Sequence, residues 1–177
     1  MKKTLLTAAL AIAGLATFAS AHAADGTIEF TGNITANTCS INGGNGGENF
    51  TVALPTVSSK TLEVAGSTAG RTPFKIALSG CTSDQPVSVH FEGGPTVSQE
   101  TGRLMVDAGG ASQVELGLLN NSFGEIKAGA ATGQQNSQVV NLANGKADLD
   151  YFVEYHSLGN ATAGAANSRV QYSISYQ

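Results

Sequence analysis

Few residues of this chain have the types and spacing that catalysis needs. After residue 23 its histidines are His90 and His156. His90 alternates with apolar residues in VSVHFE, so we expect a solvent-facing strand residue, and His156 follows near a strand end. No G-x-S-x-G motif marks a nucleophile elbow. We therefore expect no catalytic residues and no enzyme activity.

The sequence predicts neither a metal site nor a cofactor. Asp148 and Asp150 form a D-x-D pair that a Ca²⁺ site could use, but no further oxygen ligands follow at a suitable spacing, so a solvated turn is favoured. The glycine-rich segment 43–47 lacks the lysine and the following helix of a phosphate-binding loop. Two cysteines without a neighbouring histidine do not make a zinc site.

The first 23 residues have the parts of a secretory signal peptide. Lys2 and Lys3 give a basic start, residues 5–18 an apolar run, and residues 21–23 a small-x-small cleavage site. The apolar run is too short for a membrane-spanning helix. Its removal would leave 7 basic and 13 acidic residues, a net charge of −6. That balance argues against nucleic acid as a partner.

Cys39 and Cys81 are the two cysteines of the chain, and both follow the expected signal peptide. An even number of cysteines in an exported protein favours a disulfide over two free buried thiols. In the chain-entropy model, closing that loop would stabilise the fold by about 4 kcal/mol.

The elements that would position any site are short strands. Apolar residues come in brief, mostly alternating runs between Gly, Asn, Ser and Pro, and no helix of normal length is expected after residue 23. Strands are predicted over 27–36, 50–55, 72–81, 86–92, 114–119, 137–142, 150–157 and 169–177, with at most one helical turn in 128–138. Many short strands separated by turns indicate a sandwich or barrel.

Both ends of the mature chain are patterned as strands with one face to bury. At the start, that face consists of Gly26, Ile28, Phe30, Gly32 and Ile34. At the end, it consists of Val170, Tyr172, Ile174 and Tyr176. Either both strands pack into one sandwich, or the first strand adds to a neighbouring molecule by β-augmentation. The second arrangement is energetically feasible, because each large apolar side chain contributes about 1.5–3 kcal/mol on burial.

Three stretches resemble chaperone–usher pilins, specifically the type 1 major fimbrial subunit family. GTIEFTGNI followed by NTC (26–39) is similar to the family's N-terminal extension and first cysteine, and FKIALSGC (74–81) to the strand that ends at the second. Residues 151–177 are similar to the C-terminal segment, with Gly164 fourteenth from the end and Tyr176 penultimate. Residues 92–145 are not specific to the family.

The resemblance implies an all-β fold: an incomplete immunoglobulin-like sandwich that lacks its final strand and is completed by a donor strand. It implies a removed signal peptide (1–23), an N-terminal donor-strand extension (24–36) and a pilin immunoglobulin-like domain (37–177). A periplasmic chaperone would first fill the gap, and at the outer-membrane usher the extension of the next identical subunit would replace it. The product would be a head-to-tail filament on the cell surface.

The resemblance also implies the site residues. The donor-strand face would be Gly26, Ile28, Phe30, Gly32 and Ile34. The acceptor groove and chaperone-binding strand would be marked by Gly164, Val170, Tyr172, Ile174 and Tyr176. Cys39 and Cys81 would form the family's disulfide.

The expected function is that of a structural subunit of a bacterial pilus (fimbria) that supports adhesion. One alternative is a minor adaptor pilin of the same system, which would have the same size and ends. A secreted β-sandwich that binds a ligand or acts as an enzyme is less favoured, because no site for it is apparent. A tip adhesin would need an additional lectin domain, for which we see no room.

Overall fold

A computed structural model gives the fold and describes residues 28–29, 31, 34, 39–44 and 46–177. The chain divides into two units, Met1–Thr35 and Ala36–Gln177. In the first unit the described residues are Ile28, Glu29, Thr31 and Ile34, and all of them are exposed. The expected signal peptide (1–23) and three donor-face residues, Gly26, Phe30 and Gly32, lie outside the described residues.

The second unit is built from short and long strands. They are β1 (Ser40–Ile41), β2 (Thr68–Ser79), β3 (Val87–Phe91), β4 (Leu104–Met105), β5 (Val114–Leu119), β6 (Glu125–Ile126), β7 (Ala147–Ser157) and β8 (Tyr172–Tyr176). A single 3-10 turn, η1 (Ser59–Leu62), is the helical element among the described residues. The Ser58 side chain caps it by accepting the N–H of Lys60.

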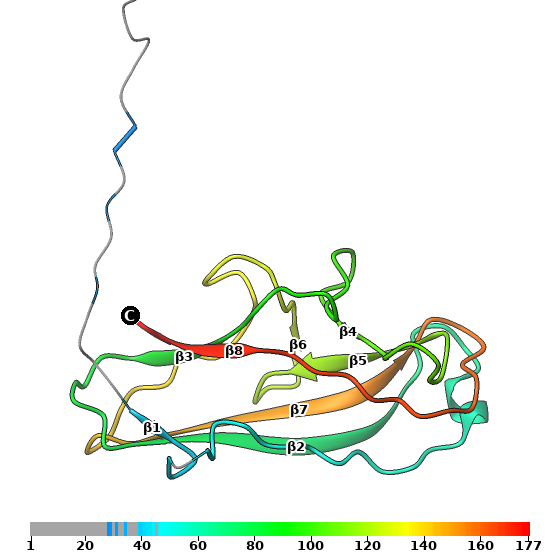
Figure 1. The fold of residues 1–177 in the computed structure, drawn as a ribbon, viewed down its shortest axis with the longest axis horizontal. Coiled ribbons are helices and arrows are strands. Elements are labelled where there is room, and N and C mark those ends of the chain that lie inside the picture. Colours follow the sequence, from blue (N-terminus) through cyan, green and yellow to red (C-terminus); the bar gives the residue numbers. More distant parts are fainter. Residues whose placement is uncertain (1–27, 30, 32–33, 35–38, 45) are drawn as a thin grey trace, which may run out of the picture. The chain divides into compact units, whose positions relative to one another are not determined.

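The strands form two antiparallel sheets. The larger sheet has the order β1-β2-β7-β5-β4, with β6 also paired to β5, and the smaller sheet consists of β3 and β8. Figure 1 shows the long strands β2 and β7 side by side, with β3 and β8 forming the other layer. Between β2 and β7, Phe74 lies opposite Tyr151 and Lys75 opposite Asp150.

The core lies between these sheets, where the alternating strands turn their apolar side chains toward one another. The larger sheet contributes Ile76 and Leu78 from β2 and Leu149, Tyr151 and Val153 from β7. Strand β3 contributes Val87, Val89 and Phe91. All eight are buried. The predicted sandwich is thereby confirmed.

Five of the predicted strands are confirmed, two are wrong, and the one at 27–36 lies mostly outside the described residues. The ranges 86–92, 114–119 and 169–177 contain β3, β5 and β8, and the ranges 72–81 and 150–157 overlap β2 and β7, which begin earlier, at Thr68 and Ala147. Residues 137–142 contribute only one bridge, between Val140 and Val87. Residues 50–55 belong to no strand, because their backbone has no pairing partner among the described residues. No helical turn forms in 128–138.

A buried glutamine replaces a strand along part of β3. Gln135 is only 2% exposed. Its Oε1 accepts the N–H of Phe91 at 2.8 Å, and its Nε2 donates to the C=O of Phe91 at 2.7 Å and to that of Ala130 at 2.9 Å. The side-chain amide thus satisfies backbone groups that a neighbouring strand would otherwise pair.

Gln135→Ala is therefore expected to destabilise the domain by about 2–3 kcal/mol, because the N–H of Phe91 loses its partner inside the protein. Urea unfolding of the variant measures this loss. Gln134→Ala is the matched control, since Gln134 is the exposed neighbour. Equal unfolding midpoints for the two variants would contradict this role of Gln135.

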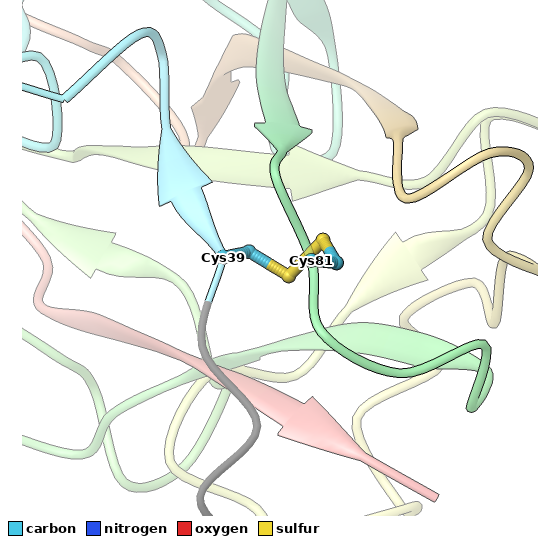
Figure 2. Close-up of a disulfide and its surroundings, with 2 residues drawn as sticks. All are labelled: Cys39 and Cys81. Atoms are coloured by element: carbon cyan, nitrogen blue, oxygen red, sulfur yellow. A yellow bond between two sulfur atoms is a disulfide. The ribbon is translucent and has the colours of Figure 1, made fainter.

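The predicted disulfide is confirmed. Cys39 and Cys81 are bonded, with their Cα atoms 4.2 Å apart (Figure 2). Cys39 directly precedes β1 and Cys81 follows β2, and Ser40 lies opposite Ser79 in that pair. The bond therefore fixes the beginning of β1 to the end of β2.

Candidate functional site

Strand β8 has one paired edge and one open edge. Among the described residues its only strand partner is β3. The N–H of Gln177 donates to the C=O of Pro86. The N–H of Glu92 donates to the C=O of Gln171. Odd-numbered residues of this segment therefore direct their backbone groups toward β3, and even-numbered residues direct theirs toward the open edge. The residues with outward-facing N–H and C=O groups are Tyr172, Ile174 and Tyr176.

The same three residues direct their side chains toward the core. Tyr172, Ile174 and Tyr176 are half-buried and pack against the core cluster. Ser173, between two of them, is exposed. One set of residues thus offers both unpaired backbone groups and apolar side chains at a sheet edge. Those are the two features that β-augmentation uses.

A groove of about 680 Å³ lies beside this edge. One wall consists of Ser168, Arg169, Val170, Gln171 and Tyr172. The other wall consists of Glu48, Asn49, Phe50, Thr51, Val52 and Leu54. The remaining lining residues form an apolar floor: Ile41, Phe74, Ile76, Phe91, Leu104, Leu116, Leu118 and Val153. The groove opens directly onto the core of the sandwich.

The residues predicted to form a strand at 50–55 contribute most of the second wall of the groove instead. Phe50, Val52 and Leu54 alternate with polar or small residues and line the groove. The sequence thus has the pattern of a strand with one buried face. A strand also requires a neighbour for its backbone, and no described segment provides one. Both walls of the groove therefore have unpaired backbone.

Aromatic rings continue from the groove into the core. Phe50 contacts Tyr172 and Phe74, with ring centroids 6.4 and 6.2 Å apart. Phe74 stacks on Tyr151 at 5.6 Å, and Phe91 meets Tyr151 edge-on at 5.3 Å. Burial raises the pKa of Tyr151 to about 12, although its hydrogen bond with Ser137 acts in the opposite direction. The Tyr151 hydroxyl is thus neutral at physiological pH.

The predicted acceptor residues separate into three groups. Val170 and Tyr172 line the groove. Ile174 and Tyr176 continue β8 beyond it and pack against the core. Gly164 lies elsewhere, against the backbone of Gly110 and Ala111, where an added Cβ would lie 2.7 Å from the Ala111 nitrogen. Gly164 therefore permits a close approach of two loops and does not line the groove.

Sequence reasoning did not assign the second wall or the floor to the site. The floor residues come from β1, β2, β3, β4, β5 and β7, and each has the pattern of an ordinary core residue. The wall could have been found from the alternation of Phe50, Val52 and Leu54, which was interpreted only as a strand.

The residues first considered for chemistry have structural partners. Asp148 and Asp150 flank Lys75, whose Nζ is 2.7 Å from Asp148 Oδ2 and 3.7 Å from Asp150 Oδ1. The hydrogen bond to Asp148 is the main cause that raises the pKa of Lys75. His90 Nε2 lies 3.5 Å from a carboxylate oxygen of Glu92. No group of three or more metal-ligating side chains occurs in the part of the chain that the structure describes.

A family model described as "FimA: Type-1 fimbrial protein, A" matches residues 54–177. The chain belongs to the type-1 fimbrial protein family. The match includes β2 to β8 and most of the groove. It confirms the resemblance noted for residues 74–81 and 151–177, and it also covers residues 92–145, which had no specific signal. The stretch 26–39, with the first cysteine, precedes the matched residues.

Two related fimbrial proteins agree with this assignment. The major fimbrial subunit SMF-1 of Stenotrophomonas maltophilia is 48% identical over 163 residues, which cover 89% of this chain and 95% of the relative. The F17 fimbrial protein of Escherichia coli is 38% identical over 175 residues, with 95% and 96% covered. This fimbrial protein is thus a structural pilus subunit that reaches the cell surface as part of a fimbria.

The fold is also that of a known pilin. The P pilus rod subunit PapA superposes with a TM-score of 0.61 at 17% identity, covering 78% of this chain and 99% of that chain. The expected fold class is confirmed: an immunoglobulin-like sandwich that lacks its final strand. No helix among the described residues has the length and apolar character needed to cross a membrane.

Proposed function

We propose that the groove of this fimbrial subunit binds the N-terminal segment, residues 24–36, of the next identical subunit. The observation that supports this proposal is the open edge of β8, where Tyr172, Ile174 and Tyr176 combine unpaired backbone groups with inward-facing side chains. A strand inserted there would pair with β8 on one side and face the 48–54 wall on the other.

The N-terminal segment has the matching pattern. Its proposed donor face consists of Gly26, Ile28, Phe30, Gly32 and Ile34. Ile28 is 78% exposed and Ile34 is 99% exposed. Burying each large side chain would contribute about 1.5–3 kcal/mol. Each ladder hydrogen bond would add about 0.5–1.5 kcal/mol. Both terms favour insertion and offset the cost of ordering and associating the segment.

The groove also accounts for the proposed partners. An apolar slot with open backbone on both walls promotes aggregation when it is exposed. A periplasmic chaperone that inserts its own strand would protect the subunit until it reaches the outer-membrane usher. Exchange of that strand for the segment of the next subunit would extend an open head-to-tail polymer. The protein's role in this scheme is structural, and no catalytic step is assigned to it.

We propose that residues 1–23 are removed on export, that 24–36 serve as the donor extension, and that 37–177 form the domain. We further propose the position of a major rod subunit. The relative at 48% identity is named a major fimbrial subunit. A minor adaptor pilin with the same ends would occupy only one or a few positions in each filament.

Deletion of the gene distinguishes these positions. A major subunit is expected to be needed for nearly every joint, so electron microscopy of the deletion strain should show cells without filaments. Restoring the wild-type gene on a plasmid is the control. Filaments of normal length and number in the deletion strain would contradict the rod assignment. Filaments that persist but lose binding to host cells would indicate the adaptor position.

A further inference from the structure

A tyrosine connects the two walls of the groove. The hydroxyl of Tyr172 donates to the C=O of Glu48 at 2.8 Å, across 124 residues of sequence. Tyr172 belongs to the wall formed by residues 168–172, Glu48 to the wall formed by residues 48–54, and both line the groove. The bond therefore spans the groove from one wall to the other.

This contact is one of the few polar contacts of the second wall, whose Val52 and Leu54 otherwise pack against the core. Residues 50–57 form no hydrogen bond, through backbone or side chain, with any other residue that the structure describes. Toward β8, the wall is attached by the bond from Tyr172 to Glu48 and by the edge-on contact of the Phe50 and Tyr172 rings. Without the hydroxyl, only the ring contact would tie this wall to β8.

A tyrosine side chain is long enough to bridge the space that one strand needs. Neighbouring strands lie about 4.8 Å apart, so two strands that flank a third are about 9.6 Å apart. An extended tyrosine side chain with a hydrogen bond at its tip spans about 9 Å from its Cα to the acceptor. Because Tyr172 directs its side chain toward the core, the connection passes on the core side of the open edge.

We propose that Tyr172 is a positioning residue that holds the groove open at the width of one strand before the donor strand enters. This role rests on the proposed function of the groove. Burial, and secondarily the nearby charge of Glu48, raise the pKa of Tyr172, so its hydroxyl remains a donor at physiological pH. Once a strand is inserted, its own ladder bonds tie the walls together. The connection then adds little, and its effect falls on the rate of entry.

Tyr172→Phe tests this role, because it removes the hydroxyl and keeps the ring against Phe50. The full-length subunit is separated from its co-expressed chaperone in urea and refolded by dilution, so that its groove is empty when a fluorescein-labelled peptide of residues 24–36 is added. We expect peptide uptake to be about three- to tenfold slower than in the wild type, as loss of one hydrogen bond predicts. The rate of peptide release is expected to change less than about twofold, because the ladder bonds dominate the finished joint.

Tyr155→Phe is the matched control, since Tyr155 is half-buried and does not line the groove. Slow uptake by Tyr172→Phe alone, with unchanged release, supports the positioning role. Wild-type uptake rates for Tyr172→Phe would overturn it and leave the groove assignment intact. Faster release that matches the slower uptake, or equal effects of both variants, would also overturn it, because these indicate general destabilisation. Failure of the wild-type subunit to take up the peptide would instead contradict the proposed function.

Discussion

A Phe30→Asp subunit is expected to fold and to bind its chaperone but to form no filaments. Phe30 is the central large residue of the proposed donor face. The substitution removes its apolar contribution and places a carboxylate in an apolar groove. Together these cost about 5 kcal/mol, roughly a several-thousand-fold loss in the stability of each joint. The subunit's own domain begins after this segment and should be unaffected.

Immunoblots of unboiled cell extracts measure this effect, because we expect the proposed joints to persist in SDS as a ladder of polymers. Thr31→Asp is the matched control. It adds the same charge one position later, on the polar face of the segment, and Thr31 is exposed. We expect the control to retain the ladder and Phe30→Asp to lose it while a normal amount of subunit remains. A normal ladder from Phe30→Asp would show that this residue does not enter the groove.

Cys39→Ser is expected to lower the amount of subunit in the periplasm several-fold. The bond to Cys81 closes a loop with a sequence separation of 42 residues. The chain-entropy model assigns such a loop about 4 kcal/mol of stability. Since domains are stable by only about 5–15 kcal/mol, this loss exposes much of the population to unfolding and proteolysis.

Immunoblots of periplasmic extracts and urea unfolding of the purified chaperone complex measure the effect. Cys81→Ser should reproduce it, and the double variant should be no worse than either single one, because all three lack the same bond. Unchanged abundance of the single variants would contradict a stabilising disulfide. A Cys81 thiol in the wild-type protein that reacts before denaturation would contradict it as well.

Local patterns were sufficient to predict the longer strands that find partners, but not the two-residue strands β1, β4 and β6. The alternation through Phe74, Ile76 and Leu78 predicts β2, and the same rule predicts β7. A strand in one sheet of a sandwich turns every second side chain toward the other sheet and buries it there. The pattern at Phe50 and Val52 is equally clear, yet no strand forms there. Strand formation depends on a backbone neighbour, and that information is not local to the segment.

Only part of the groove was predicted from the sequence, because the rest depends on contacts between residues far apart in the chain. The C-terminal pattern identified Val170 and Tyr172, which line the groove. The contact between Tyr172 and Glu48 joins residues 124 positions apart, and that between Gln135 and Phe91 joins residues 44 apart. Neither residue type nor spacing indicates such pairs, because polar side chains satisfy whichever backbone groups the fold brings near. Resemblance placed Gly164 near the acceptor strand, whereas its role here is loop packing.

The position of the disulfide has a mechanical consequence. A pull on the N-terminal segment enters the domain at Cys39, just before β1, which is only two residues long and could be peeled away. The covalent bond transmits the tension to the end of β2 instead. Strand β2 is paired with β7 at nine positions, so many hydrogen bonds share the force. Stretching the chain by its N-terminus thus loads the longest strand pair of the sandwich and bypasses the two-residue pair of β1 with β2.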